Sequence, residues 1–423
     1  MRDDARSRTA RRTRRLRRTV ALSVLAATSV AAVPRPADAQ QAPAPLPDSV
    51  GVAQPDVVGG VRHPLRLRVL GRTPDGSPLL ATSETSGYTP AEVRAYLGLT
   101  GTGAGQTIAI VTAYDAPNVA KDLAVFDDAF DLPAPPSFRK VNQSGGTKYP
   151  KVDAGWALEA ALDVQWAHAV APAASILLVE ASSSSLTNLL TAVSYATKQP
   201  GVTVVSGSFG TPQFAKQTGH DSKCRLTTGV CVFASGDEGN PGTYPAANPY
   251  ALAVGGTSLL LGAAGEVDTE VAWSDSGGGV SPYAAKPAYQ DGVTTATRRT
   301  LPDVSYSGDP ATGFAVYSST PVDGQSGWFQ MGGTSAGAPQ WAGVVAVANQ
   351  LRKGAGKGPL VATTSTGASP LHTALYRSGA LGDITSGSNG DCGAVCTAGP
   401  GFDAVTGLGS PRRGLDVVLR DAS

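Results

Sequence analysis

Residues 175–206 read SILLVEASSSSLTNLLTAVSYATKQPGVTVVS, and this stretch decides the fold. A short apolar run, Ser175–Glu180, is followed by Leu186–Lys198, where apolar residues recur at helical spacing, and then by a second apolar run, Val202–Ser206. Short apolar runs joined by helical segments are typical of buried parallel strands with crossover helices.

The same alternation continues on both sides of this stretch. It predicts an α/β fold of three layers, with a mostly parallel central sheet and helices on both faces. In such sheets, ligands bind beyond the carboxyl ends of the strands. The further predicted strands are Thr107–Thr112, Val230–Ala234 and Ala251–Val254, and the further helices are Ala116–Phe130 and Trp156–Val170.

The composition is that of a globular protein with a large core. Of 423 residues, 41% are hydrophobic and 16% are charged. The net charge is only +1, and many of the arginines lie within the first eighteen residues. This balance argues against a dedicated nucleic-acid-binding protein, which concentrates basic charge on one face.

The N-terminus has the three parts of an export signal. A basic stretch, Arg11–Arg18, precedes the short apolar stretch Val20–Val33 and an A-x-A cleavage site at Ala37–Ala39. The apolar stretch is shorter than the roughly 20 residues of a membrane span. We therefore predict a signal peptide at 1–39, a secreted, extracellular protein and no stable membrane association after cleavage. A membrane anchor is the alternative, and the export route stays open.

Four cysteines lie in the exported part. An even count in an oxidising compartment favours disulfides, and the local pairs Cys224–Cys231 and Cys392–Cys396 are the expected connectivity. A zinc site is the alternative, although no histidine lies at ligand spacing from these cysteines.

The segment Gly332–Pro339 reads GGTSAGAP and leads into a predicted helix, Gln340–Gln350. A serine at this position, Ser335, lies at a helix N-terminus, where free N–H groups favour a developing negative charge. An ordinary helix cap has the same sequence features, so this segment alone leaves a nucleophile and a cap equally open.

A serine nucleophile needs a base, and the usual base is histidine. Of the four histidines, His63 lies in the segment after the signal peptide, and the other three have no partner pattern around them. Glu159 and Asp163 can replace a histidine, because four residues on one helix separate them by about 40°. Two carboxylates on one face share a proton, which raises at least one pKa. The alternative is a solvated acidic stripe, but the helix is apolar nearly all round, as buried helices are.

Asp237 follows the predicted strand Val230–Ala234 in the turn Ser-Gly-Asp-Glu-Gly. A protonated carboxyl there can donate a hydrogen bond to an oxyanion. A simple Asx turn is the alternative.

Two Gly-rich segments near the C-terminus carry one aspartate each, Asp383 and Asp403. Carboxylates and main-chain carbonyls at such turns suit Ca²⁺, although Asx turns in a surface loop are an equal alternative. The segments are Gly382–Thr385 (GDIT) and Gly399–Asp403 (GPGFD).

Taken in order, these motifs resemble the sedolisin family of serine-carboxyl peptidases. The resemblance covers Tyr88 to about Pro411 and includes the Glu-x-x-x-Asp helix, ASGDEG, YPAANPY, the GTSA segment and the paired C-terminal segments. It implies a subtilisin-like fold and a peptidase domain with calcium-binding loops (87–423). The family normally has a long folded prosegment, and here the expected organisation departs from it: a signal peptide (1–39) is followed by a short leader or linker without a full-length prodomain (40–86).

The resemblance also implies the roles of the site residues. Ser335 would be the nucleophile, Glu159 the general base and Asp163 the residue that orients it, while Asp237 and the Ser335 amide would form the oxyanion hole. One structural Ca²⁺ would be bound by the side chains of Asp383 and Asp403 and the carbonyls of Ile384, Gly399 and Gly401.

The expected function is therefore a secreted, monomeric endopeptidase that hydrolyses protein or peptide substrates at acidic pH. Phe209 stands where the family often has Trp, a departure that can alter a substrate pocket. An exported, inactive homologue that binds peptides is the alternative function, while the missing histidine motif disfavours a His-dependent subtilisin.

Overall fold

An eight-stranded sheet runs through the part of the chain from residue 46 onward. The structure is a computed structural model and describes residues 49–52, 60–72, 77–364 and 369–422, so the predicted signal peptide lies outside the described residues. The strand order is β14-β13-β11-β9-β6-β8-β7, with β17 on β13, and every pair is parallel except β13–β14. The strands are β6 Thr107–Ala113, β7 Phe138–Asn142, β8 Ser175–Ala181, β9 Val202–Gly207, β11 Val230–Ala234, β13 Ala251–Leu261, β14 Val267–Ala272 and β17 Val304–Ser307.

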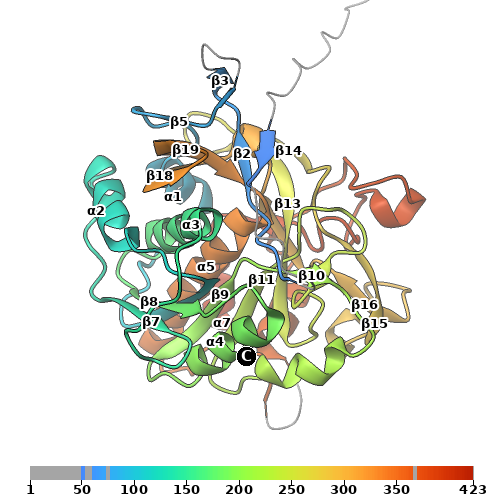
Figure 1. Ribbon diagram of the computed structural model, residues 1–423. Coiled ribbons are helices and arrows are strands. Elements are labelled where there is room, and N and C mark those ends of the chain that lie inside the picture. Colours follow the sequence, from blue (N-terminus) through green and yellow to red (C-terminus); the bar gives the residue numbers. More distant parts are fainter. Residues whose placement is uncertain (1–48, 53–59, 73–76, 365–368, 423) are drawn as a thin grey trace, which may run out of the picture. The chain divides into compact units, whose positions relative to one another are not determined.

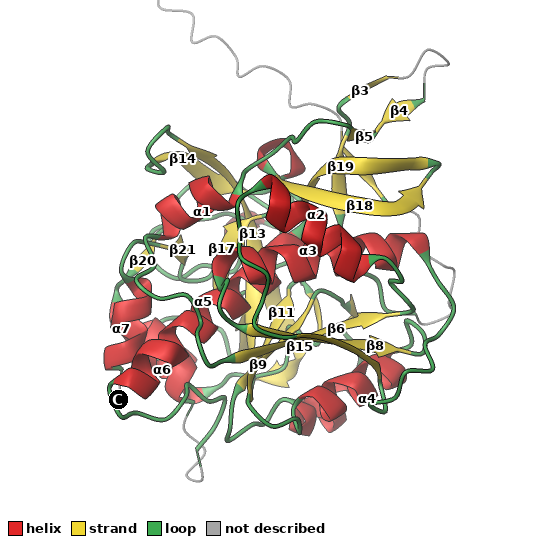
Figure 2. Ribbon diagram, turned by 90° about the vertical axis from the view of Figure 1, so that its left-hand side faces the viewer, coloured by secondary structure: helices red, strands yellow, loops and turns green. Residues whose placement is uncertain are grey.

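Helices cover both faces of this sheet (Figures 1 and 2). Alternate residues of β6 show this, because Ile108 and Ile110 pack in the cluster of α3 and α5, whereas Ala109 and Val111 pack in the cluster of α4. The predicted three-layer α/β fold is confirmed. The helices are α1 Pro90–Leu97, α2 Val119–Ala129, α3 Ala154–Val170, α4 Leu186–Ala196, α5 Thr334–Gly354, α6 Pro370–Ser378 and α7 Leu415–Asp421.

A second sheet contains residues that precede the first helix. Its order is β1-β2-β19-β18, and β5 also pairs with β19. The described residues of the segment expected to be a leader or linker therefore pair with strands that lie just before α5, while the boundary at residue 87 stays a prediction. The strands are β1 Ser49–Gly51, β2 Arg66–Arg68, β5 Ala81–Thr82, β18 Phe314–Val322 and β19 Gln325–Gly332.

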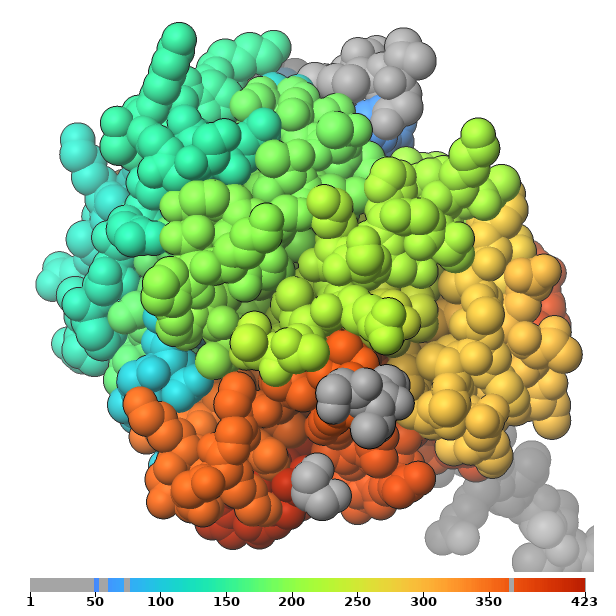
Figure 3. Space-filling view, turned by 90° about the horizontal axis from the view of Figure 1, so that it is seen from below, coloured from blue at the N-terminus to red at the C-terminus, as the bar shows by residue number. Residues whose placement is uncertain are grey.

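The remaining strands form small two-stranded pairs at the periphery. Viewed from below, green and lime segments from the middle of the chain lie beside orange segments from its last third, so elements distant in sequence form one surface (Figure 3). None of the described helices is long and apolar enough to span a membrane. The pairs are β3 Gly71–Arg72 with β4 Pro78–Leu79, β10 Thr211–Pro212 with β12 Thr243–Tyr244, β15 Gly279–Ala285 with β16 Arg298–Leu301, and β20 Leu381–Gly382 with β21 Ser410–Pro411.

Helix α5 begins at Thr334 rather than at Gln340, so Ser335 lies inside its first turn. The helix was predicted to begin only after Pro339, because proline lacks the N–H that an α-helix directs to the carbonyl four residues earlier. The structure replaces that hydrogen bond: the hydroxyl of Ser208 lies 3.2 Å from the carbonyl oxygen of Ser335. The helix can therefore include the proline without leaving a buried carbonyl unpaired.

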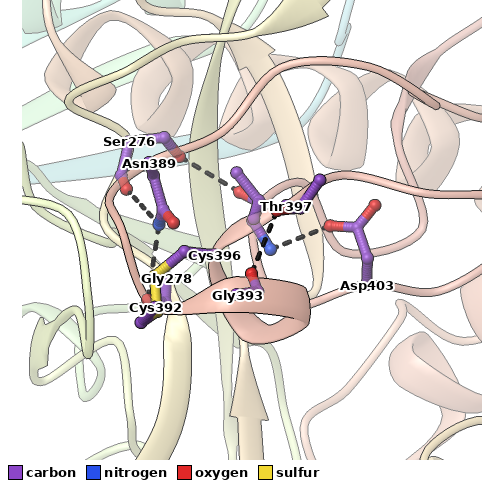
Figure 4. Close-up of a disulfide and its surroundings, with 9 residues drawn as sticks. Ser276, Gly278, Asn389, Cys392, Gly393, Cys396, Thr397 and Asp403 are labelled. Atoms are coloured by element: carbon purple, nitrogen blue, oxygen red, sulfur yellow. Dashed lines mark hydrogen bonds between the residues drawn. A yellow bond between two sulfur atoms is a disulfide. The ribbon is translucent and has the colours of Figure 1, made fainter.

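One of the two expected disulfides forms. Cys392 and Cys396 are bonded, with 5.2 Å between their Cα atoms, and the neighbouring Asn389 donates a hydrogen bond to the Ser276 carbonyl (Figure 4). The Cys224–Cys231 pairing was wrong, because both are buried free thiols. Burial, together with the neighbouring Cys231, raises the pKa of Cys224 well above its usual value.

Candidate active site

Ser335 is fully buried in the first turn of α5. Gly333 before it has φ 94°, a left-handed conformation that turns β19 sharply into the helix and that a side chain would strain. The backbone N–H of Ser335 belongs to the helix N-terminus, where no intrahelical acceptor exists. It is therefore available to an oxygen that enters the site.

Glu159 and Asp163 lie on α3, which packs against α5, and both are fully buried. Burial raises the pKa of Glu159 to about 8, and the nearby hydroxyls of Ser335 and Ser208 oppose this rise. Burial, and next the charge of Glu159, raise the pKa of Asp163 well above its usual value. The pair therefore holds at least one proton, as expected for two carboxylates at one site.

Ser208 connects Asp163 to the serine. Its hydroxyl oxygen lies 2.7 Å from Asp163 Oδ1 and 3.2 Å from the Ser335 carbonyl oxygen. A hydroxyl has one hydrogen, so it serves both neighbours best when a protonated Asp163 donates to it and it donates to the carbonyl. The raised pKa of Asp163 fits this arrangement, which ties the carboxyl pair to the first turn of α5.

Asp237 lies in the turn after β11 and contacts Thr334, the residue before Ser335. Its Oδ1 accepts hydrogen bonds from both the backbone N–H and the hydroxyl of Thr334, each at 2.8 Å. Burial raises the pKa of Asp237 to about 8. Because Oδ1 already accepts two hydrogen bonds, the proton of the neutral carboxyl belongs on Oδ2, which makes no other hydrogen bond within the described residues.

Residues 60–68, here called the cleft segment, pass beside these groups, and residues 60–66 line a cleft that Asp237 also lines. Arg62 and Gly210 exchange two backbone hydrogen bonds of 2.8 Å, and the Val61 N–H donates to the Ser184 carbonyl at 2.9 Å. Farther along, Arg66 and Leu67 pair with Gly332 and Met331 of β19. In Figure 1 the blue chain that leads into β2 passes across the front of the domain toward β10. The segment thus lies antiparallel to its neighbours on both sides of Ser335.

Between these two paired stretches, the Pro64 carbonyl lies at Ser335. Its oxygen accepts the Ser335 N–H at 3.3 Å. A Cβ placed on Gly333 would collide with this oxygen and lie 2.7 Å from Asp237 Oδ2, so the carbonyl and the carboxyl converge above Gly333. A backbone carbonyl of the chain thus accepts the Ser335 N–H and lies on the same side of Gly333 as Asp237 Oδ2.

His63 also lies at the site, like Ser208 and Pro64, although the sequence did not predict any of these three contacts. His63 Nδ1 lies 3.4 Å from Glu159 Oε2, and its ring packs edge-on against Trp156 at 4.9 Å between centroids. Burial lowers the pKa of His63 to about 3, so the imidazole is neutral there. The sequence placed it outside the catalytic domain, and no motif around it indicated this contact.

The other histidines lie elsewhere in the described structure. His168 contacts Asp127 and the Pro133 carbonyl. His372 contacts Asp303, and His220 packs near Tyr244.

The two C-terminal segments lie together. Asp383 accepts the Gly401 N–H at 2.8 Å, and Asp403 accepts the Gly399 N–H at 3.1 Å. No group of three or more His, Cys, Asp or Glu side chains in the described part of the chain could hold a metal ion. The predicted Ca²⁺ ligands are two carboxylates and main-chain carbonyls, among them that of Ile384. Such a donor set suits Ca²⁺ without a cluster of three charged side chains.

Comparison with known proteins agrees with this geometry. The subtilase family model matches residues 152–385. The chain belongs to the subtilase family. Within it, the chain is similar to sedolisins, which confirms the resemblance seen in the sequence.

The similarity to individual proteins is moderate. Kumamolisin of Bacillus sp. is 34% identical over 79% of this chain and 64% of its own length, and sedolisin of Pseudomonas sp. is 26% identical over 88% and 68%. The chain thus spans about two thirds, or slightly less, of these relatives. The solved structure of Pseudomonas sedolisin, a serine-carboxyl proteinase complexed with two molecules of pseudo-iodotyrostatin, matches 80% of this chain and 99% of its own with a TM-score of 0.68 at 26% identity. Human tripeptidyl-peptidase 1 is 31% identical over 43% of this chain and 35% of its own length.

Proposed function

We propose that this protein is a secreted serine-carboxyl endopeptidase that cleaves protein or peptide substrates through an acyl-enzyme. The observation that carries the proposal is the Pro64 carbonyl, which lies against the Ser335 amide and beside Asp237 as a substrate carbonyl would. An extended peptide backbone thus fits this cleft in register with the proposed catalytic groups.

In the proposed mechanism, Ser335 Oγ attacks the substrate carbonyl carbon while Glu159 accepts the hydroxyl proton. Asp163 positions Glu159 and holds the shared proton. The Ser335 N–H and the neutral Asp237 stabilise the oxyanion. Glu159 then protonates the leaving amine, and water hydrolyses the ester by the reverse proton path.

The cleft segment favours an endopeptidase over a tripeptidyl-peptidase. Its chain continues past the third residue before the Pro64–Leu65 bond, since Val61 is the fourth and Gly60 still pairs with Ser185. A tripeptidyl-peptidase requires an end of the cleft after the third residue. Asp237 must be neutral in order to donate a hydrogen bond, which is compatible with the proposed acidic working pH and predicts that activity falls as pH rises through the pKa of this carboxyl, about 8 with the cleft occupied.

Calcium would be bound by Asp383 and Asp403 with the carbonyls of Ile384, Gly399 and Gly401. When bound, the ion would neutralise the two carboxylates and fix the C-terminal loops. We expect no role for it in the chemical steps, which the four catalytic residues carry.

The test compares variants on acid-denatured casein. Ser335→Ala and Glu159→Gln should each lower the rate at least about 10³-fold, because one removes the nucleophile and the other the base. Glu84→Gln, which changes an exposed glutamate, is the matched control and should keep the wild-type rate. Wild-type activity in Glu159→Gln would overturn the carboxylate base, and an inactive wild type would favour the peptide-binding homologue.

A further inference from the structure

The cleft segment carries two arginines that each face a carboxylate of the cleft. Arg66 Nη2 lies 3.5 Å from Asp275 Oδ2 and donates to the Asp237 carbonyl at 3.1 Å. Arg62 Nη1 lies 3.6 Å from Glu238 Oε1. Relative to the Pro64–Leu65 bond, Arg66 is the second residue after it and Arg62 the third residue before it.

The two pairs differ in burial. The side chains of Arg66 and Asp275 are 30% and 41% exposed, whereas those of Arg62 and Glu238 are 70% and 76% exposed. Water and salt screen exposed pairs more strongly than partly buried ones. The contact of Arg66 with Asp275 should therefore contribute more to binding than the contact of Arg62 with Glu238.

Arg66 also lies close to the catalytic groups. Its charge lowers the pKa of Asp237, whereas the charge of Asp275 raises it. Its guanidinium donates to the backbone of Asp237, whose side chain is one wall of the oxyanion site. A cation at this position is thus held both by a carboxylate and by the turn that carries Asp237.

We infer that the enzyme selects peptides with a basic residue two positions after the cleaved bond, and that Asp275 is the residue that selects it. Glu238 adds a weaker preference for a basic residue three positions before the bond. This inference rests on the proposed function, because it assumes that a substrate backbone binds in the same position and direction as the cleft segment. The cleft of about 780 Å³ beside the segment is lined by residues of the segment itself and by Glu238, so a side chain at the position of Arg62 borders open space.

The test uses fluorogenic peptides with the sequence of residues 61–68, Val-Arg-His-Pro-Leu-Arg-Leu-Arg, and the same peptide with alanine in place of the arginine of position 66. The full chain should cleave the arginine peptide with a kcat/KM roughly two- to fivefold higher than the alanine peptide. The difference should lie mainly in KM and should shrink at high salt, because a charge pair causes it.

Asp275→Asn tests the assigned residue. In this variant the ratio of the two kcat/KM values should fall to about one. Asp128→Asn, which removes an exposed carboxylate from α2, is the charge-matched control and should keep the wild-type ratio. Glu238→Gln should instead reduce selectivity, by a smaller factor, between peptides that differ at the position of Arg62.

The outcomes separate the two proposals. A wild-type ratio near one, or a ratio that persists in Asp275→Asn, overturns the inference while peptide cleavage still supports the proposed function. Failure to cleave either peptide or denatured casein overturns the proposed function and the inference with it.

Discussion

Helix α3 and the cleft segment meet at Glu159, but different interactions hold them there. Every residue of α3 from Gly155 to Val170 is buried, and most of its contacts are apolar. The cleft segment buries alternate side chains and is held largely by backbone hydrogen bonds to Gly210, Ser184 and β19. Apolar packing depends on the shape of each side chain, whereas backbone pairing accepts many sequences.

The comparison indicates that α3 is a permanent part of the site and that the cleft segment is a replaceable occupant. While the segment is docked, its backbone occupies the positions that a substrate backbone would need. An external protein therefore gains access only when the segment leaves or is cut.

The larger of the two effects that test this contrast concerns Asp237, which, like α3, is a permanent part of the site. In the proposed mechanism its neutral form donates to the oxyanion, and this form is lost as pH rises through its pKa, which burial raises to about 8 with the cleft occupied. Casein hydrolysis at pH 9 should thus be at least about tenfold slower than at the optimum.

Asp237→Asn separates this titration from other effects of pH. An amide keeps an acceptor for Thr334 and presents an N–H donor at every pH. The variant should lose the decline between pH 7 and pH 9. An identical decline in both proteins would assign it to another group.

A smaller effect is expected from Val61→Asp, which acts on the replaceable side. Val61 is only 3% exposed, so a carboxylate there would have to be buried among apolar side chains or the segment would have to undock. The intact chain should then cleave an external peptide faster, on the order of tenfold in initial rate. Arg62→Ala changes the next, exposed side chain and should give a clearly smaller increase. An unchanged rate in Val61→Asp would mean that the segment does not limit access.

The surroundings of Glu159, Asp163 and Ser335 could be predicted from the sequence, because the patterns that indicate them each lie within a single helix or turn. The apolar surroundings of Glu159 and Asp163 indicated a buried helix, and the Gly turn before Ser335 indicated a helix N-terminus. Only the start of α5 was misplaced, since the hydroxyl that compensates Pro339 comes from Ser208, distant in sequence.

The cleft segment was predicted to be a leader or linker, although its sequence has a local pattern that is typical of a strand. Leu65 and Leu67 alternate with Arg66 and Arg68, a period of two that fits the observed strand. Which chain the strand pairs with depends on the folded positions of Gly210 and β19, and no sequence pattern encodes this. The contact of His63 with Glu159 was missed for the same reason.

The most direct test of the site is the fate of the Pro64–Leu65 bond in the chain itself. Intact mass and N-terminal sequencing of the purified full chain, incubated at acidic pH, should show a new N-terminus at Leu65 as water adds across the bond. Ser335→Ala should remain uncut under the same conditions. Wild-type protein that digests casein but keeps this bond intact, or a Ser335→Ala chain that still cuts it unaided, would contradict the placement of Pro64 at a catalytic Ser335.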